Sequence, residues 1–370
     1  MLSGTAPASA MTAHSTEAGA GSAVMIEARS KVGMRAFTAA PQRPVLYEAL
    51  RAGVALPYEC ATGTCGTCKA RRVSGVILND WPDAPGAGYL NPAREEVLLC
   101  QTRALADCAF EVPGRADFGR SPAIRPRFGQ AVVLELRNLT HDVAALRVQM
   151  EPALEFEAGQ FALLRTPHVK GYRAYSMANH AGKAEEVDFI IKRKLGGGFT
   201  EWLFSAAVRG DRLEWFGALG KATFSPREQR TIACIAGGSG IASILSILEA
   251  GATARHFEQF EATVFFGVRT RQDVFYLDRL NRLAESSPHT LQITIVFSHD
   301  EVDPTLGDRY PKLLFDTGFP HEIAARDLAG RFAGRVAYIA GPPILVDVSI
   351  RMLITQARLP ARDIRYDKFS

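Results

Sequence analysis

The alternation of apolar and polar positions divides the chain into three stretches with different periods. In the first, residues 25–113, short apolar segments are separated by polar and glycine-containing turns. Short strands around a single helix are typical of a small α+β fold. The segments that we expect to form strands are 24–26, 35–37, 69–76 and 97–99, and the expected helix is 45–50, which Gly53 ends.

In the second stretch, residues 128–226, apolar segments are separated by turns that contain Pro, Gly, Asn and Asp. Several strands at this spacing predict a barrel or a sandwich. A helix is expected to begin at the glycines before Thr200 and to end near residue 208. The expected strands are 130–136, 144–150, 161–165 and 187–192.

In the third stretch, residues 227–370, continuous apolar runs alternate with helical patterns. Strands that are apolar along their whole length, with helices between them, predict a parallel sheet covered on both faces. The apolar runs are 232–235, 264–266, 293–297 and 336–339, and the expected helices are 241–250, 276–284 and 344–356.

Composition restricts the functions that this chain can have. The net charge of +4 is too small to indicate a nucleic-acid partner. Apolar runs are too short for a membrane span. Residues 1–24 are rich in Ala, Ser, Thr and Gly and lack the pattern of a signal peptide, so we expect a disordered tail and a cytoplasmic protein. Residues 114–127 lack periodicity and are expected to form a linker.

Four cysteines carry the strongest chemical signal in the chain. Cys60, Cys65 and Cys68 follow the pattern C-x4-C-x2-C, and Cys100 follows after 31 intervening residues. This is the plant-type spacing for the ligands of a 2Fe–2S cluster. Glycines between the first three cysteines permit sharp turns that aim backbone N–H groups at sulfur. The spacing therefore predicts a one-electron carrier in the first stretch.

Other interpretations of these cysteines were weighed. A four-cysteine zinc site usually has two close pairs, whereas this sequence has one. A disulfide framework requires a secreted protein, and no export signal is present. Cys108 and Cys234 lack ligand spacing, and we expect both to be buried as small apolar side chains.

Two glycine-rich turns come directly before predicted helices. Gly237, Gly238 and Gly240 separate an apolar run from a helix, and Gly198 and Thr200 begin the helix of the second stretch. Free N–H groups and the positive end of a helix dipole bind phosphates at such positions. A structural glycine turn is the alternative for the first, and a helix capped by a threonine explains the second equally well.

A third motif, Arg173-Ala174-Tyr175-Ser176, offers groups that suit a flavin nucleotide. The Arg173 guanidinium can form paired hydrogen bonds with a phosphate. The Tyr175 ring offers a flat face to a flavin, and the Ser176 hydroxyl can bond its reactive nitrogen. Alone, such a motif is more often just the edge of a short strand.

In their order along the chain, the motifs resemble one family, the reductase components of bacterial multicomponent oxygenases. The resemblance covers residues 25–370 and implies three domains. The motifs that carry it are the cysteine loop, Arg173-Ala174-Tyr175-Ser176, residues 237–240, Gly341-Pro342-Pro343 and Tyr366-Asp367-Lys368-Phe369. The implied domains are an α+β (β-grasp) plant-type ferredoxin (25–113), an antiparallel β-barrel that binds FAD (128–226) and an α/β parallel-sheet domain that binds NAD (227–370).

The resemblance also implies a role for each motif residue. Arg173 would pair with FAD phosphate, Tyr175 would lie against the isoalloxazine, and Ser176 would sit near its N5 atom. Ser176 and Phe369 are the residues expected at the reacting atoms. Gly198 and Thr200 would contact the FAD pyrophosphate, and Gly237, Gly238 and Gly240 would contact the pyrophosphate of the nicotinamide dinucleotide. Gly341 and Pro342 would line the path by which the nicotinamide reaches the flavin. Phe369 would cover one face of the flavin.

The implied activity is electron transfer from a nicotinamide through FAD to the 2Fe–2S cluster. We favour NADH over NADPH, although Arg269 and Arg271 could hold a 2′-phosphate. Two positions depart from the family. Many relatives have Cys where this chain has Ala340, and Pro where it has Ser243. The first departure bears on how the nicotinamide is positioned.

The implied partner is an oxygenase hydroxylase component or an intermediate Rieske ferredoxin, served by a monomeric reductase. Residues 79–86 resemble reductases of diiron toluene, alkene and phenol monooxygenases, which favours a role in aromatic hydrocarbon catabolism. Reductases of Rieske ring-hydroxylating dioxygenases and of deoxysugar dehydratases are alternatives. A four-cysteine metal or flavin sensor without turnover is an alternative from another class, and the nucleotide-binding motifs argue against it.

Overall fold

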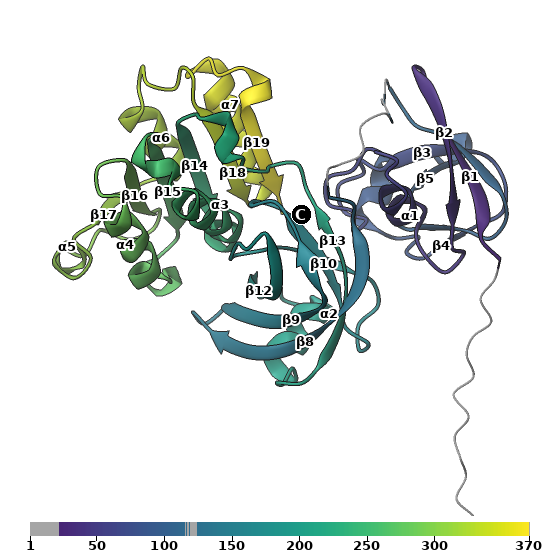
Figure 1. Cartoon of the computed structure of the whole chain (residues 1–370), viewed down its shortest axis with the longest axis horizontal. Coiled ribbons are helices and arrows are strands. Elements are labelled where there is room, and N and C mark those ends of the chain that lie inside the picture. The colour runs from purple at the N-terminus through teal and green to yellow at the C-terminus, as the bar shows by residue number, and fades with distance from the viewer. Residues whose placement is uncertain (1–21, 115, 117, 119–123, 370) are drawn as a thin grey trace, which may run out of the picture.

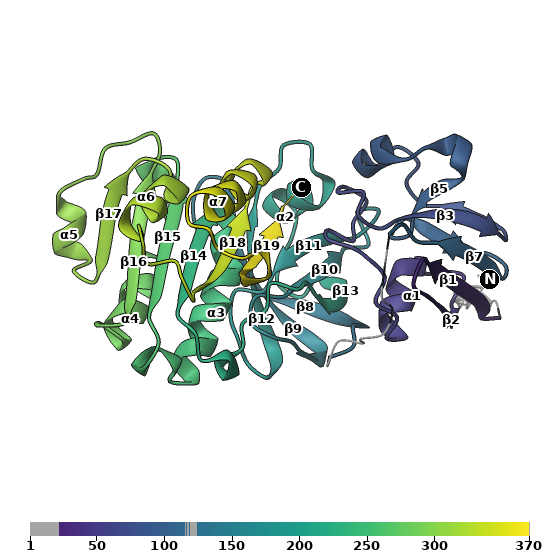
Figure 2. The ribbon, with the colours of Figure 1, turned by 90° about the horizontal axis from the view of Figure 1, so that it is seen from above.

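The computed structural model describes residues 22–114, 116, 118 and 124–369 and shows three consecutive domains (Figure 1). Figure 2 shows them side by side, with the barrel in the middle. Most of the expected tail, and part of the expected linker, lie outside the described residues, and Val24 already begins the first strand. No described helix is both long enough and apolar enough to span a bilayer.

The N-terminal domain is a mixed sheet with one helix packed against it. Its elements are β1 (Val24–Ser30), β2 (Gly33–Ala39), α1 (Val45–Arg51), β3 (Lys69–Ser74), β4 (Ile77–Asn79), β5 (Glu96–Leu98), β6 (Thr102–Ala104) and β7 (Cys108–Glu111). Within the described part of the domain, the main sheet has the order β2-β1-β7-β3-β5, and β4 pairs with β6. Only β1 and β7 are parallel neighbours in that sheet. The expected α+β fold is confirmed.

The middle domain is an antiparallel barrel-like sheet. Its elements are β8 (Arg127–Asn138), β9 (Val143–Glu155), β10 (Phe161–Arg165), β11 (Arg173–Ser176), β12 (Lys183–Lys192), α2 (Gly198–Ser205) and β13 (Arg212–Leu219). The strand order over the described residues is β11-β10-β13-β8-β9-β12. Trp215 and Phe189 are fully buried inside it. The helix α2 ends three residues before the expected limit because the backbone of Ala206 leaves the helical region, with φ of −135°.

The C-terminal domain is a parallel sheet between two layers of helices. Its strands are β14 (Ile232–Gly237), β15 (Ala262–Val268), β16 (Leu291–Phe297), β17 (Leu313–Thr317), β18 (Val336–Gly341) and β19 (Ile364–Lys368). Its helices are α3 (Ile241–Thr253), α4 (Leu277–Ser286), α5 (Thr305–Arg309), α6 (Pro320–Asp327) and α7 (Pro343–Thr355). The described strands have the order β17-β16-β15-β14-β18-β19, and all neighbours are parallel.

The two faces of this sheet explain its continuous apolar runs. One face packs against α3 and α4, with Val264 and Phe266 in that core. The other packs against α6 and α7, with Phe265 and Ile339 in that core. From β14 the chain continues to β15, β16 and β17 toward one edge of the sheet. It then returns to β18, on the other side of β14, so the strand order reverses at β14. In open α/β sheets, ligands bind beyond the carboxyl ends of strands at such a reversal.

Aromatic side chains join the N-terminal domain to the barrel. Tyr47 of α1 stacks on Phe216 of β13, with ring centroids 4.8 Å apart, and Phe216 contacts Phe128 at 4.5 Å. Tyr172 meets Tyr47 edge-on at 5.7 Å. The Tyr47 hydroxyl donates a hydrogen bond of 2.8 Å to the carbonyl of Ala61, inside the cysteine loop. The domains therefore share one apolar core, and that core contacts the loop directly.

Candidate functional site

The cysteine loop lies between α1 and β3, and its path depends on glycine. Gly63 and Gly66 have φ of +91° and +77°, a region that side chains with a Cβ rarely adopt. A Cβ on Gly66 would also lie 2.7 Å from the ring of Tyr89. These turns bring backbone amides to sulfur. The amides of Thr62 and Cys65 each donate to the Cys60 Sγ at 3.4 Å.

The four predicted ligands form two pairs of thiols. Cys60 and Cys65 are the first pair, and the Sγ atoms of Cys68 and Cys100, 3.3 Å apart, are the second. In each pair one thiol stabilises the thiolate of the other, so the pKa of Cys60 falls to about 4 and that of Cys68 also falls, while the pKa of Cys65 and of Cys100 rises. Thiolates are the form that binds metal.

A 2Fe–2S cluster has two irons, and four cysteines supply two thiolates to each. The two pairs therefore fit such a cluster.

The remaining two cysteines behave as expected. Cys108 and Cys234 are buried, 4% and 0% exposed. Burial raises the pKa of both thiols. Neither lies in the cysteine loop, so they are apolar packing residues.

A cavity of about 770 Å³ lies where the three domains meet. Segments from every domain line it: the cysteine loop, the barrel strand β11 and the turn after β14. Ten of the predicted site residues line this one cavity, namely Cys60, Arg173, Tyr175, Ser176, Gly198, Thr200, Gly237, Gly238, Pro342 and Phe369. The structure thus brings the motifs together.

On the barrel side, the strand β11 places the Arg-x-Tyr-Ser motif on the cavity wall. The Arg173 guanidinium donates to the Tyr172 carbonyl at 2.9 Å and lies 5.9 Å from the ring centre of Trp81. No described carboxylate pairs with it, so its charge is available to a phosphate. The Tyr175 ring packs against Phe199, with centroids 5.2 Å apart, and burial raises the pKa of Tyr175.

The glycine loop before α2 forms another part of the wall. Thr200 is buried, and its hydroxyl donates to the carbonyls of Lys194 and Gly197 at 2.9 and 3.0 Å. The same hydroxyl accepts from the Lys194 amide at 3.1 Å. Thr200 therefore fixes the shape of the loop. A Cβ on Gly198 would lie 2.9 Å from the Val169 side chain, so the loop packs too closely for a larger residue.

On the C-terminal side, the predicted glycines divide into two groups. Gly237 and Gly238 line the cavity, whereas Gly240 and Gly341 are not among its lining residues. A Cβ on Gly240 would lie 2.3 Å from the Ala340 carbonyl oxygen, and one on Gly341 would lie 3.2 Å from the Gly237 amide nitrogen. These two glycines let the ends of β14 and β18 approach each other behind the cavity.

The carboxyl group of Asp367, for which the sequence predicted no role, lies beside Ser176. The Ser176 hydroxyl donates a hydrogen bond of 2.8 Å to Asp367, which β19 carries into the cavity. Loss of solvent raises the pKa of Asp367 to about 6, and the bond from Ser176 opposes part of that rise. Two residues further, the Phe369 amide donates to the Gly341 carbonyl at 3.0 Å. Asp367 belongs to the terminal motif. The sequence could not identify Ser176 as its partner, because the two residues are 191 positions apart.

The two arginines considered for a 2′-phosphate have different surroundings. Arg269 is exposed and lines the cavity. Arg271 is held by two carboxylates: its backbone amide donates to Asp300 at 2.7 Å, and its guanidinium lies 3.3 Å from Asp303. One of the two cations is therefore already neutralised.

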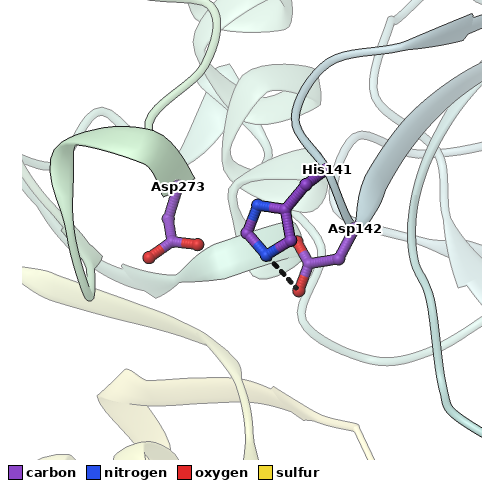
Figure 3. Close-up of side chains that lie close together, drawn as sticks. All are labelled: His141, Asp142 and Asp273. Carbon is purple, nitrogen blue, oxygen red and sulfur yellow. Dashed lines mark ion pairs between the residues drawn. The ribbon is translucent and has the colours of Figure 1, made fainter.

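His141, Asp142 and Asp273 come close together where the barrel meets the C-terminal domain (Figure 3). Their potential ligand atoms lie within 4.8 Å of one another. Lys192 already places its ammonium group 2.9 Å from Asp142, and Asp273 accepts from the Thr270 amide at 2.9 Å. The cluster therefore brings charged side chains of two domains together, and one of its carboxylates already pairs with a lysine.

Comparison with known proteins matches each domain to a family. Residues 32–105 match the 2Fe-2S iron-sulfur cluster binding domain, residues 130–224 the oxidoreductase FAD-binding domain, and residues 234–349 the oxidoreductase NAD-binding domain. The expected cofactor classes are thereby confirmed, and they occur in the expected order.

Relatives resemble the chain over almost its whole length. The ferredoxin–NAD(P)+ reductase CarAd of Metapseudomonas resinovorans is 32% identical, over 91% of this chain and 98% of that protein. The ferredoxin–NAD+ reductase component of the alkene monooxygenase system of Xanthobacter autotrophicus is also 32% identical, over 90% of this chain and 98% of that protein. The structure of the ferredoxin reductase in carbazole 1,9a-dioxygenase aligns with a TM-score of 0.80 and 29% identity, over 95% of this chain and 100% of that one. With relatives this similar along all three domains, the chain belongs to the ferredoxin–NAD(P)+ reductases that are reductase components of oxygenase systems, and it is an oxidoreductase with 2Fe–2S, FAD-binding and NAD-binding domains.

Proposed function

We propose that this reductase takes electrons from NADH and delivers them to an oxygenase partner. When bound, FAD would supply the conversion of a two-electron hydride into single electrons, and the cluster would supply a one-electron carrier. The observation that carries the proposal is the shared cavity. One cavity is lined by Cys60 of the cysteine loop, by the Arg-x-Tyr-Ser motif and by Gly237 and Gly238 of the dinucleotide turn.

The residues of the cavity would divide the work of binding. Arg173 would hold a phosphate of FAD, since no described carboxylate competes for it. The loop fixed by Thr200 would present backbone N–H groups to the pyrophosphate. Tyr175, packed on Phe199, would offer its ring to the flavin. Gly237 and Gly238 would approach the pyrophosphate of the nicotinamide dinucleotide, with Pro342 beside it.

Ser176, Asp367 and Phe369 would act at the reacting end. The Ser176 hydroxyl proton is directed at Asp367, so the Ser176 oxygen keeps its lone pairs free toward the cavity. Phe369 would cover the flavin face until the nicotinamide takes its place. Its backbone is tied to β18 by the bond from its amide to the Gly341 carbonyl, and the side chain would move aside for the nicotinamide.

The surroundings of Arg271 support NADH as the donor. A 2′-phosphate requires cations without partners, and Arg271 is neutralised by Asp300 and Asp303. Carboxylates at this position repel a phosphate and suit a ribose hydroxyl. We expect a higher kcat/KM with NADH than with NADPH, and a reversed preference in steady-state assays would contradict this assignment.

For the partner, we propose the hydroxylase of a diiron monooxygenase, and the Rieske component of a dioxygenase system is the second candidate. The support is the stretch 79–86 together with the similarity to an alkene monooxygenase reductase. The similarity to a carbazole 1,9a-dioxygenase reductase supports the second. All three centres lie in one chain, so we propose a monomer. Rates of NADH-dependent reduction of a diiron hydroxylase and of a Rieske ferredoxin would separate the candidates.

The electron path is tested on the purified protein under anaerobic conditions. We expect bound flavin and iron, bleaching of the flavin band on addition of NADH, and the EPR signal of a reduced 2Fe–2S cluster. Metal analysis is the control for the cysteine site. A colourless zinc protein that does not react with NADH would overturn the proposal and would favour a sensor module.

A further inference from the structure

Two consecutive residues next to a cluster ligand contact both of the other domains. Tyr58 and Glu59 directly precede Cys60. The Tyr58 hydroxyl accepts a hydrogen bond of 3.1 Å from the Gly220 amide, at the end of β13 in the barrel. The Glu59 carboxylate accepts one of 3.2 Å from the hydroxyl of Tyr366, in β19 of the C-terminal domain. The cysteine loop is thus held from two directions at one point.

The groups at the far ends of these bonds are themselves fixed. Gly220 has φ of +101°, and a Cβ there would lie 3.1 Å from the ring of Phe161, so its amide has little freedom. Tyr366 is followed by Asp367, which accepts from Ser176 in the cavity. A shift of β19 would therefore move Tyr366 and Asp367 together.

We propose that Tyr58 and Glu59 are positioning residues that hold the cysteine loop against the flavin cavity, and that the bond from Glu59 to Tyr366 couples this docking to the position of β19. The inference rests on the proposed electron path, because it concerns the step between flavin and cluster. Glu59 also lines the cavity, and the proposal gives it and Tyr58 a role in docking the loop.

The contacts of the N-terminal domain show why these two bonds matter. The aromatic contact of Tyr47 with Phe216 joins the domain to the barrel through α1, and the Tyr47 hydroxyl holds the carbonyl of Ala61 in the loop. The bonds of Tyr58 and Glu59 hold the residues that directly precede Cys60. A net hydrogen bond changes an equilibrium constant by roughly twofold to tenfold. Two such bonds can therefore decide how much of the protein has its loop docked.

The first test uses Tyr58→Phe, Tyr366→Phe and the double variant in the holoprotein. Stopped-flow spectra would follow flavin reduction and cluster reduction at separate wavelengths. We expect cluster reduction to slow by about twofold to tenfold for each substitution and further in the double variant. In Tyr58→Phe, whose lost bond goes to the barrel and not to β19, NADH should still reduce the flavin at the wild-type rate. Tyr89→Phe is the matched control, because the Tyr89 hydroxyl has no hydrogen bond within the described part of the chain. Equal rates in all variants would overturn the proposal.

The second test needs no electron transfer. Hydrogen exchange of the protein as purified, with its cofactors bound and without NADH, would be read by mass spectrometry and would report on residues 54–60 and 364–369. We expect faster exchange in both segments for Tyr366→Phe and in neither for Tyr89→Phe. Unchanged exchange in both would overturn the docking role. If wild-type cluster is never reduced by NADH, the proposed electron path fails, and exchange still decides the docking role by itself.

A double-mutant cycle addresses the coupling between domains. Glu59→Ala and Tyr366→Phe remove the two ends of one hydrogen bond, so their effects on exchange should be smaller together than their sum. Additive effects would show that the two residues act separately and would overturn the coupling. In Tyr366→Phe, which removes no charge, the EPR spectrum of the cluster should remain as in the wild type, because the hydroxyl acts through loop position.

Discussion

The cysteine loop and the cavity shared by the three domains meet at Cys60, yet they are built in opposite ways. The loop carries three of the four predicted ligands in one short segment, and its shape follows from local turns at Gly63 and Gly66. The cavity takes its wall from all three domains, and its Ser176–Asp367 pair joins residues 191 positions apart. A local site tolerates changes elsewhere in the molecule, whereas an assembled site depends on how the domains pack. Four substitutions test this difference.

The largest effect is expected for Cys65→Ser. This change removes one ligand of the cluster, so the 2Fe–2S absorbance and EPR signal should be lost. Because the loop is a local structure, NADH oxidation with ferricyanide, which takes electrons from the flavin, should remain. Cys108→Ser, at a buried cysteine outside the loop, should keep the cluster. Loss of both activities in Cys65→Ser would show that the two sites are not independent.

The next effect is expected for Gly240→Ala, which disturbs the assembled site from behind. The new methyl group would lie 2.3 Å from the Ala340 carbonyl oxygen, which belongs to a central strand and cannot move aside. We expect the free energy of unfolding of the C-terminal domain to fall by about 1–3 kcal/mol, measured in urea. Gly307→Ala is the control, because nothing lies within 4 Å of its position. It should change stability by less than about 1 kcal/mol. Equal effects would contradict the close approach of β14 and β18.

A smaller, pH-dependent effect is expected for Asp367→Asn. The folded protein raises the pKa of Asp367 from 3.8 to about 6. Between these values the folded state binds more protons than the unfolded state, so this residue makes stability fall as pH rises from about 4 to 6. The asparagine variant lacks that loss, so its stability relative to the wild type should increase across this window. Urea unfolding at pH 4.5 and 7 gives the comparison. A constant difference would show that Asp367 titrates normally.

The smallest effect is expected for Phe369→Ala. If nicotinamide must displace the Phe369 ring, the alanine variant removes that competition, and KM for NADH should fall by a few-fold with little change in kcat. Leu195→Ala, at a side chain that is 86% exposed, is the control. Steady-state kinetics with ferricyanide provide the measurement. Unchanged KM would remove Phe369 from the nicotinamide site.

The sequence predicted those features that depend on short-range pattern. The barrel strand expected over 161–165 is Phe161–Arg165, and the helix expected over 45–50 is Val45–Arg51. The cysteine spacing predicts four ligands, and the structure brings these four thiols together in two pairs. Strands β13 and β19 were not foreseen. In β19, Ile364–Lys368, polar residues leave no apolar run to mark the strand.

The roles of Asp367, Tyr58 and Glu59 could not be predicted, because each depends on a partner in another domain. The surroundings of Gly240 and Gly341 could not be predicted from the sequence either. Both belong to glycine motifs that suggest ligand contact, yet they serve the packing of two strand ends. Only the folded chain distinguishes a glycine that faces a ligand from one that faces a carbonyl.

The aromatic junction between α1 and β13 bears on how such reductases could be recombined. Because Tyr47 stacks on Phe216 inside a core shared by two domains, the N-terminal domain cannot be exchanged without affecting the barrel. A transplanted domain without an aromatic residue at that position would leave Phe216 against a void and lose the hydrogen bond to the cysteine loop. To redirect this protein toward another oxygenase, one would therefore change the solvent-exposed surface of the N-terminal domain. The surface of that domain that packs against the barrel would be kept.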